Sequence, residues 1–412
     1  MEYIKAEVAA KKWNMSLRRV QDLCKEGKVF GAQKFGTNWM IPETATRPLD
    51  GRRKDTKQIE TATRPLIRKS PFLDMTDLYS EPGRADECAD ALYYHPEAQA
   101  LFRAQIAYSR GEIDKVYEYA QHFLDSHSGF YAMISGGMLL SLCAIWHGDD
   151  NMWNKARQHI CDAPCEDLAH ADILELSLAV GNSALRITGE YPEWFTRGCF
   201  DSLPHDAHPA ARVYYVKYLL IIAQELALGN ISFENVKGIG LMKTLPYIIE
   251  PMITQMTVDK IIIAEIYLRL FCAVAYNQCG DRRRAEMHLD KAIDLCLPDR
   301  LYGPLVETRR QLGMLLDERL AIKDADALKR VKELHKTMLD GWTKLHNAVL
   351  KKTVSVSLSA REREIARLAS FGMTDTQISE QLFISISSVK SIIRSAKNKT
   401  GVEKRSQLSE FI

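Results

Sequence analysis

A short run of small polar and cationic residues near the carboxyl end of the 412-residue chain has the chemistry of a surface that binds DNA. Hydroxyl and amino groups at the start of a helix can reach base edges in the major groove, and nearby cations can bind phosphates. Residues 387–405 hold six Lys and Arg residues against one acid, Glu403. The side chains expected to face outward are Ser387, Ser388, Lys390, Ser391, Arg394 and Lys397, and with Ser385 and Lys399 they are the candidate DNA contacts of this segment. The alternative is a solvated basic face on an ordinary helical hairpin.

Several short helices are needed to position these side chains. Residues 359–362 have the pattern of a capping box, and an apolar stripe follows it. Thr374 and Gln377 form a second capping box, Phe383-Ile384 makes the next turn, and Ser385 caps the third helix. A short last helix is expected near Arg405. The residues predicted to point inward are Ile365, Leu368, Ala369, Ile378, Leu382, Val389, Ile393 and Ala396.

The segment from Leu358 to Val402 resembles the LuxR-type helix-turn-helix of bacterial transcription regulators. The residues that carry the resemblance are Leu358, Ser359, Arg361, Glu362, Glu364, Ile365, Thr374, Ile378, Leu382, Ile384, Ser385, Ser388, Val389, Lys390, Gly401 and Val402. Two positions depart from the family pattern: Ile392 stands where a His is common, and Thr400 stands where the family has a core Leu. Both departures bear on the placement of the third helix.

This resemblance implies a four-helix DNA-binding domain over residues 353–412, with double-stranded promoter DNA as its partner. Thr374 joins the outward-facing residues as a candidate DNA contact. Domains of this kind usually bind paired half-sites, so we expect a homodimer on DNA. Leu408 and Phe411 then have two interpretations: they form part of the dimer contact, or they pack onto the domain's own core.

Residues 1–42 are expected to form a second small module, a helix-turn-helix followed by a β-hairpin that serves as a wing. Residues 7–13 suit a short helix with Val8, Ala9 and Lys12-Trp13 around one face. Ser16 is expected to cap a second helix, and residues 32–41 read as strand, turn and strand. The second helix should bury Val20, Leu23 and Cys24.

The N-terminal module resembles the small winged modules of the excisionase and MerR-like group. Such a resemblance implies DNA contacts from the second helix and from the wing tip. The candidate residues are Arg18, Arg19, Gln21, Lys34, Thr37 and Asn38. A module of this size can instead mediate protein contacts, and the sequence leaves both interpretations open.

The net charge of +2 hides a strong asymmetry along the chain. Residues 1–69 carry a net +8 (16 Lys and Arg, 8 acids), residues 70–357 a net −9 (30 and 39), and residues 358–412 a net +3 (9 and 6). Residues 43–73 are expected to be a linker, because the segment Glu-Thr-Ala-Thr-Arg-Pro-Leu occurs twice, at 43–49 and at 60–66. Basic ends on an acidic middle indicate two nucleic-acid modules that flank a body which repels DNA.

Residues 74–352 alternate helical stripes with glycine-containing turns, which predicts a helical-repeat body. The best-formed unit has small residues at 273, 285 and 292, with Tyr276, Gly280 and Leu289 between them, and this spacing resembles a tetratricopeptide repeat. Degenerate copies are expected to end their first helices at Gly111, Gly148, Gly189 and Gly229. Prolines at 204–209 and 246–251 are interpreted as breaks between helix pairs.

The fold class expected is therefore mostly α: an irregular tetratricopeptide-like α-solenoid, flanked by an N-terminal winged helix-turn-helix and a C-terminal four-helix LuxR-type domain. Such a body offers a concave face for an effector or for RNA polymerase, and the residues do not say which. We expect no catalytic constellation, cofactor loop or metal site, and hence no enzyme. The cluster His159, Cys161, Cys165 and His170 fits no strong zinc spacing, and Trp146, Trp153 and Trp194 are expected in the core.

No basic and apolar leader is evident, and the apolar stretches 218–229 and 261–276, which we interpret as the longest, both contain charged residues. With nine scattered cysteines, these features predict a cytoplasmic protein without a membrane span. The function predicted is a cytoplasmic bacterial transcription regulator whose repeat body is a sensor or an assembly platform. The alternative is a repeat-scaffold adapter whose terminal modules bind proteins.

Overall fold

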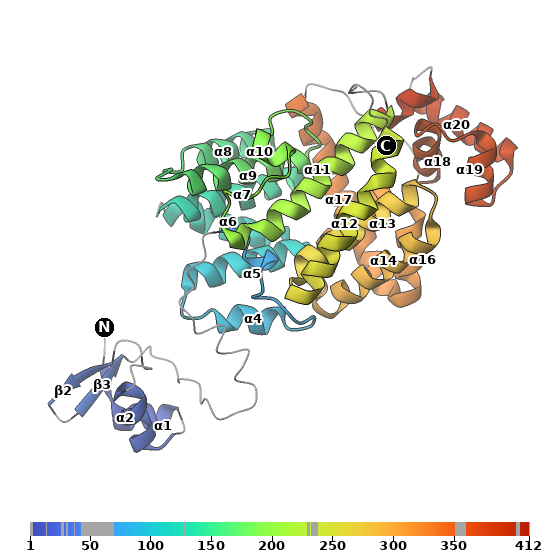
Figure 1. The fold of residues 1–412 in the computed structure, drawn as a ribbon. Coiled ribbons are helices and arrows are strands. Elements are labelled where there is room, and N and C mark those ends of the chain that lie inside the picture. The colour runs from blue at the N-terminus through green and yellow to red at the C-terminus, as the bar shows by residue number, and fades with distance from the viewer. Residues whose placement is uncertain are drawn as a thin grey trace. The chain divides into compact units, whose positions relative to one another are not determined.

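The computed structural model is mostly helical, with one small three-stranded sheet (Figure 1). It describes residues 3–13, 15–25, 29, 32–36, 38–42, 70–126, 129–228, 231, 238–350, 360–400 and 404–411. The side chains of residues 126, 228, 239, 360, 395, 398–400, 410 and 411 are not described. Contacts divide the chain into two units, Met1–Arg64 and Pro65–Ile412, and each is described by itself. Residues 43–69 of the predicted linker (43–73) lie outside the described residues, whereas residues 70–73 are buried and Phe72 and Leu73 belong to the core of the helical body.

The N-terminal unit is a helical hairpin joined to a small antiparallel sheet. Its elements are β1 (Tyr3–Lys5), α1 (Ala6–Lys12), α2 (Leu17–Lys25), β2 (Gln33–Phe35) and β3 (Asn38–Pro42). The predicted hairpin is confirmed, with Gln33 opposite Met40, but β1 was missed: it adds to the other edge of β3 and pairs Ile4 with Ile41. The turn at Gly36 has a φ of +60°, which glycine adopts without strain.

Side-chain burial in this unit follows the prediction in α2 and departs from it in α1. Val20, Leu23 and Cys24 are buried as expected, and the Ser16 hydroxyl accepts a hydrogen bond from the Arg19 amide at 3.3 Å, which caps α2. Val8, in contrast, is 51% exposed. The reason is that α1 turns another face inward, where the small residues Ala6, Ala9 and Ala10 are buried. The Trp13 indole, just after the helix, packs in the same core.

The second unit begins with a helical body. Its elements are η1 (Leu73–Met75), α4 (Ala85–Ala91), α5 (Pro96–Arg110), α6 (Ile113–Ser126), α7 (Gly129–His147), α8 (Asp150–Cys161), α9 (Leu168–Ala184), α10 (Glu193–Thr196), η2 (His205–Ala207), α11 (His208–Leu228), α12 (Gly238–Asp259), α13 (Ile262–Gln278), α14 (Arg282–Cys296), η3 (Leu297–Asp299), α15 (Tyr302–Leu312), α16 (Met314–Lys323) and α17 (Ala325–Leu350). One continuous hydrophobic core runs from Phe72 to Met338.

The helix pair expected around Gly280 is present as α13 and α14. Ala273, Ala285, Ala292 and Leu289 are fully buried between these helices and their neighbours, and the Asp281 side chain caps α14. Gly111 and Gly148 likewise end α5 and α7 with positive φ. The tetratricopeptide-like solenoid as a whole remains a prediction.

Two of the predicted breaks are wrong, and Gly229 lies outside the described residues. The helix before Gly189 ends earlier, because α9 stops at Ala184 and the chain turns at Arg186, which has a φ of 58°. Pro246 and Pro251 lie inside the continuous helix α12. Each proline removes a helical hydrogen bond, but the buried stripe of Leu245, Ile249, Ile253 and Met256 offsets that cost by packing.

The longest charge-free stretch was missed by the sequence analysis: it is α7, from Gly129 to His147. This helix is long and apolar enough to cross a bilayer, but 78% of its most apolar window is buried within the fold. Gly136 and Gly137 let it approach neighbouring helices closely, since a Cβ at Gly137 would lie 2.5 Å from Ile160. These contacts are those of a central packing helix.

Helices from the end of the body pack on helices from its beginning. A Cβ added at Gly341 of α17 would lie 2.0 Å from the Trp146 carbonyl of α7, so only glycine permits that crossing. Similarly, Gly303 of α15 lies against the backbone of Tyr108 and Ser109 in α5. These contacts go beyond the nearest-neighbour stacking of a simple repeat array.

The remaining helices form the C-terminal domain. They are α18 (Ala360–Ser370), α19 (Asp375–Leu382), α20 (Ile386–Thr400) and the 3-10 helix η4 (Arg405–Phe411). This domain has its own hydrophobic core, separate from the core of the body. The predicted order of three helices and a short last one is therefore present.

Candidate nucleic-acid interface

The core of the C-terminal domain consists of the residues that the sequence predicted to point inward. Ile365, Leu368, Ala369, Ile378, Val389, Ile393 and Ala396 are buried together, with Leu382 packed against them. Each set recurs every three or four residues along its helix, so one face of each helix turns toward the others. Opposite this core, α20 presents its other face to solvent.

The turns that orient α20 are fixed by side-chain caps. The Thr374 hydroxyl accepts from the Gln377 amide at 3.2 Å, and the Gln377 side chain accepts from the Thr374 amide at 2.8 Å, so the predicted capping box is confirmed. Gly372 has a φ of +81° at the turn before it. The first predicted capping box begins at Ser359, which lies outside the described residues.

Five of the candidate DNA contacts on α20 are exposed: Ser387, Ser388, Lys390, Ser391 and Arg394. Lys397 is half-buried and has an interaction of its own, and the side chain of Lys399 lies outside the described residues. The exposed set occupies the first two turns and a half of the helix, which is the part that enters a major groove in helix-turn-helix proteins.

Ser385 and Thr374 both have the helix-capping roles predicted from the sequence, and Ser385 also contacts neighbouring hydroxyls. The Ser385 hydroxyl accepts from the Ser388 amide at 3.1 Å and lies 2.8 Å from the hydroxyls of both Ser387 and Ser388. Its oxygen therefore caps α20 and orients two neighbouring hydroxyls. A direct role of Ser385 or Thr374 at DNA remains a prediction.

The last helix is tied to the start of α19. The Arg405 guanidinium donates to the Met373 carbonyl at 2.8 Å and pairs with Asp375 at 3.2 Å, so this cation is engaged within the domain. Leu408 is fully buried in the domain core. This burial favours the second interpretation of Leu408, packing onto the domain itself, over an apolar edge for a dimer. The side chain of Phe411 lies outside the described residues.

Two exposed apolar side chains beside the start of α20 were not predicted from the sequence. Phe383 is 89% exposed and adopts a φ of 52° in the turn between α19 and α20, and Ile386 is 41% exposed. A bulky residue in the left-handed region is uncommon and strained. Its place in the turn was visible in the sequence, whereas its outward direction depends on the backbone conformation.

In the N-terminal unit the candidate contacts lie on α2 and on the hairpin. Arg18, Lys34 and Asn38 are exposed, whereas Arg19 and Gln21 are half-buried, and Arg19 has an interaction within the unit. Thr37 lies outside the described residues. Helix α2 and the predicted hairpin are both present, and the sheet has a third strand at its edge; the winged helix-turn-helix itself remains a prediction.

A compact three-helix core with an exposed, cation-bearing third helix defines a helix-turn-helix DNA-binding domain. Residues 356–412 match the family described as bacterial regulatory proteins, luxR family. This match covers the C-terminal domain, and it makes the chain a DNA-binding transcription regulator in general terms; the family consists of regulators and not of enzymes. Comparisons with curated proteins and with solved structures gave no match.

A cavity of about 130 Å³ lies where the body meets the C-terminal domain. Its walls include Glu307 and Arg310 of α15, His335 and Trp342 of α17, and Arg367 of α18. Glu307 is fully engaged: it pairs with Lys217 at 2.9 Å and accepts hydrogen bonds from Tyr108 and Tyr267 at 2.9 and 3.0 Å. Arg186, also in the wall, is neutralised by Glu225 at 2.8 Å.

Two further arginines in this cavity lack an acidic partner among the described residues. Arg310 lies over the Trp342 ring, 5.0 Å from its centre, and Arg367 donates to the Gln311 carbonyl at 2.7 Å. Burial, followed by the charge of Arg186, lowers the pKa of Arg310 to about 9, and burial lowers the pKa of Arg367. Arg367 is buried and Arg310 is half-buried, and neither forms an ion pair with an acidic side chain among the described residues, so the cavity wall carries an excess of positive charge that favours an anion.

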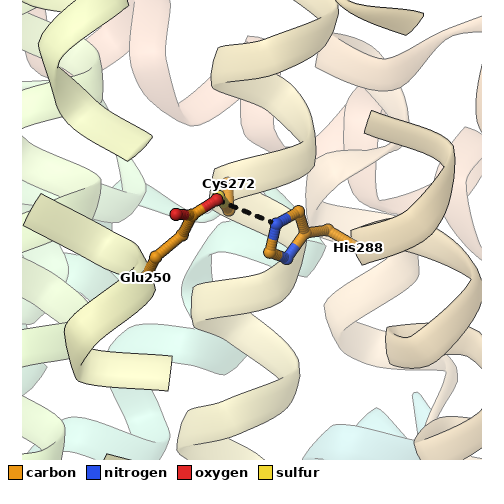
Figure 2. Close-up of side chains that lie close together, drawn as sticks. All are labelled: Glu250, Cys272 and His288. Carbon is orange, nitrogen blue, oxygen red and sulfur yellow. Dashed lines mark ion pairs between the residues drawn. The ribbon is translucent and has the colours of Figure 1, made fainter. Parts of the chain in front are cut away.

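Metal-ligating side chains gather in the body at a place that the sequence analysis did not consider. Glu250, Cys272 and His288 come from α12, α13 and α14 and point toward one another (Figure 2). The cluster that the sequence analysis did consider is not assembled among the described side chains: Cys161 and Cys165 are exposed, and His170 stacks on Phe130 at 4.0 Å. Trp146 and Trp153 are buried as predicted, and Trp194 is partly buried against the core.

Proposed function

We propose that this protein is a cytoplasmic bacterial transcription regulator that reads promoter DNA through α20. The observation that carries the proposal is the exposed row of Ser387, Ser388, Lys390, Ser391 and Arg394 on a domain that matches the luxR family. Short hydroxyls pre-oriented by Ser385 suit base edges, and the two cations suit a guanine edge or a phosphate. A homodimer on paired half-sites belongs to this proposal, with a contact surface other than Leu408.

The test uses the full-length chain and a duplex that it selects from a random-sequence library. Lys390→Ala should weaken binding to that duplex by about 1–3 kcal/mol and leave the melting temperature unchanged, because Lys390 is exposed and makes no core contact. Lys336→Ala, which removes an exposed cation from α17, is the matched control and should bind as the wild type does. Equal affinity of the two variants would overturn the role of α20.

We also propose that the body is the sensor, and that its effector is a small anion bound in the cavity between Arg310 and Arg367. An anion there would contact α15 of the body and α18 of the DNA-binding domain at once. If the anion binds more tightly to one relative arrangement of the body and the DNA-binding domain than to another, it shifts the population toward that arrangement and so changes DNA binding. The dimensions of the cavity favour inorganic phosphate or a short carboxylate over a large ligand.

Thermal unfolding of the full-length protein can test this sensor role. Phosphate and succinate are titrated against sodium chloride at matched ionic strength, and one of the two should raise the melting temperature of the wild type. Arg310→Met should abolish the rise, whereas Lys336→Met should keep it. Equal melting curves in all three salts would exclude these anions as effectors and leave the DNA-binding proposal standing.

The competing function is a repeat-scaffold adapter whose terminal modules bind proteins. The exposed Phe383 and Ile386 favour it, since apolar side chains are common in protein contacts. The salt dependence of duplex binding discriminates the two functions. Phosphate contacts release counter-ions and give a steep decline in affinity with salt, which an adapter would not show.

A further inference from the structure

Three ligand-type side chains meet inside the body, away from the proposed DNA-binding surface. Glu250 of α12, Cys272 of α13 and His288 of α14 each offer a donor atom, and these atoms lie within 4.8 Å of one another (Figure 2). Cys272 is fully buried and His288 is 4% exposed, whereas Glu250 is partly exposed to solvent. The three helices are consecutive, so one small ion could join them.

The burial of the polar His288 imidazole is not explained by its packing contacts. Neither of its ring nitrogens has a hydrogen-bond partner among the residues that the structure describes, and Nε2 lies 3.5 Å from a Glu250 oxygen. Burial is the main cause that lowers the pKa of His288, with the charge of Arg269 adding to it. A buried neutral imidazole has one donor and one acceptor, and leaving each unpaired costs about 1–3 kcal/mol.

Neighbouring side chains hold this trio in the way that outer-shell residues hold metal ligands. The Tyr276 hydroxyl donates to Glu250 Oε1 at 2.6 Å, and its ring stacks on His288 with centroids 5.7 Å apart. Arg269 is paired with Glu265 at 2.7 Å, and Arg284, which donates to the Tyr276 hydroxyl at 3.3 Å, is paired with Asp281 at 3.2 Å. The carboxylate and the imidazole are therefore oriented, and the local positive charge is balanced.

We propose that Glu250, Cys272 and His288 bind a zinc ion. One oxygen, one sulfur and one nitrogen ligand form a set that suits Zn²⁺ among common divalent cations, and a fourth position toward solvent would be taken by water. On binding, the Cys272 thiol loses its proton to solvent and its sulfur bonds to the metal. The ion would cross-link α12, α13 and α14, and the free energy of zinc binding would stabilise the folded body.

The experiment uses the full-length protein, stripped with a chelator, dialysed and reloaded. With Zn²⁺, elemental analysis should find one ion per chain and a higher melting temperature. With Co²⁺ in its place, absorption should show the charge-transfer band of a cobalt–thiolate bond. Cys272→Ala should remove the band and lower zinc affinity at least about tenfold; Cys296→Ala, another buried cysteine, should leave both unchanged.

A conservative variant keeps the test valid if the loss of the buried thiol disturbs folding. Glu250→Gln keeps the side-chain volume at a partly exposed position, and it should fold and still lose affinity for Zn²⁺. Failure to retain zinc after dialysis would overturn the proposal. So would a cobalt–thiolate band that persists in Cys272→Ala, because the exposed Cys161, Cys165 or Cys199 would then be the ligands.

Discussion

The guanidinium of Arg367 donates a hydrogen bond of 2.7 Å to the main-chain carbonyl of Gln311, which links α18 of the DNA-binding domain to the last turn of α15 in the body. Carbonyls in the last turn of a helix lack a helical partner and carry partial negative charge, so a cation is favourable there. The link leaves the outward face of α20 exposed. Body and DNA-binding domain can thus be coupled without blocking the proposed DNA contact.

The first prediction concerns how much Arg367, which has no acidic partner among the described residues, contributes to the free energy of unfolding. Arg367→Met should change the free energy of unfolding of the anion-free protein by less than about 1 kcal/mol, since the lost hydrogen bond is offset by removal of a buried, uncompensated charge. Arg309→Met is the paired control: it deprives Asp317 of two hydrogen bonds, at 3.0 and 2.8 Å, and should cost about 1–3 kcal/mol. Urea unfolding of both variants measures the difference. A larger loss in Arg367→Met would assign Arg367 to stability instead of anion binding.

The second prediction separates a capping residue from a DNA contact. Thr374→Ala removes the oxygen that accepts from the Gln377 amide and should destabilise the C-terminal domain by about 0.5–2 kcal/mol. Thr376→Ala, at the exposed second position of the same helix, should cost little. Chemical unfolding followed in the C-terminal domain by NMR gives both values. Equal stability of the two variants would contradict the capping role.

The third prediction concerns the helix pair α13–α14. Ala285 is fully buried, so Ala285→Leu should overpack the contact and lower the free energy of unfolding by about 1–3 kcal/mol. Met287→Leu, on the exposed face of the same helix, serves as the control. Differential scanning calorimetry compares the two. A wild-type melting temperature for Ala285→Leu would mean that the pair is looser than the structure indicates.

Local sequence patterns predicted the C-terminal domain well because its determinants are close in the chain. Thr374 and Gln377 are three residues apart, and each inward stripe lies within one helix. The cavity could not be predicted from local patterns, because Arg186, Arg310 and Arg367 are far apart in sequence. They come together only when their helices pack in the fold. The same holds for Glu250, Cys272 and His288, which share no spacing. Pro246 misled for a related reason, since its helix is maintained by packing and not by local preference.

The fourth prediction follows from the buried His335 in the cavity wall. Its Nδ1 lies 3.0 Å from the Val306 carbonyl, to which it donates as the neutral ring, and burial lowers its pKa from 6.5 to about 4. The unfolded chain therefore binds a proton that the folded protein does not between these pH values. Stability should fall as pH drops through about 6.5, by up to about 3 kcal/mol near pH 4 from this group.

A comparison with His335→Asn isolates that contribution. Burial also lowers the pKa of His288, so this residue makes its own contribution to the pH dependence of stability. The quantity to measure is therefore the difference in free energy of unfolding between wild type and variant, at steps from pH 7.5 to pH 4.5. The variant should be the less stable protein at neutral pH, and the gap should narrow as the solution becomes acidic. A gap independent of pH would show that His335 is protonated equally in both states.

The last prediction concerns the N-terminal unit, whose exposed Arg18, Lys34 and Asn38 suit a second contact with DNA. When two DNA-binding modules belong to one chain, binding of the first raises the effective concentration of the second. Deletion of residues 1–42 should then weaken binding to a promoter duplex that carries the native flanking sequence, and should make the salt dependence shallower because fewer counter-ions are released. Charge reversal of the exposed cation, Arg18→Glu, should reproduce part of this loss in the intact chain. Val8→Lys, which changes an exposed residue of α1 away from the proposed contact, controls for a general effect of substitution in the N-terminal unit. Unchanged affinity and salt slope after the deletion would assign the N-terminal unit to protein contacts.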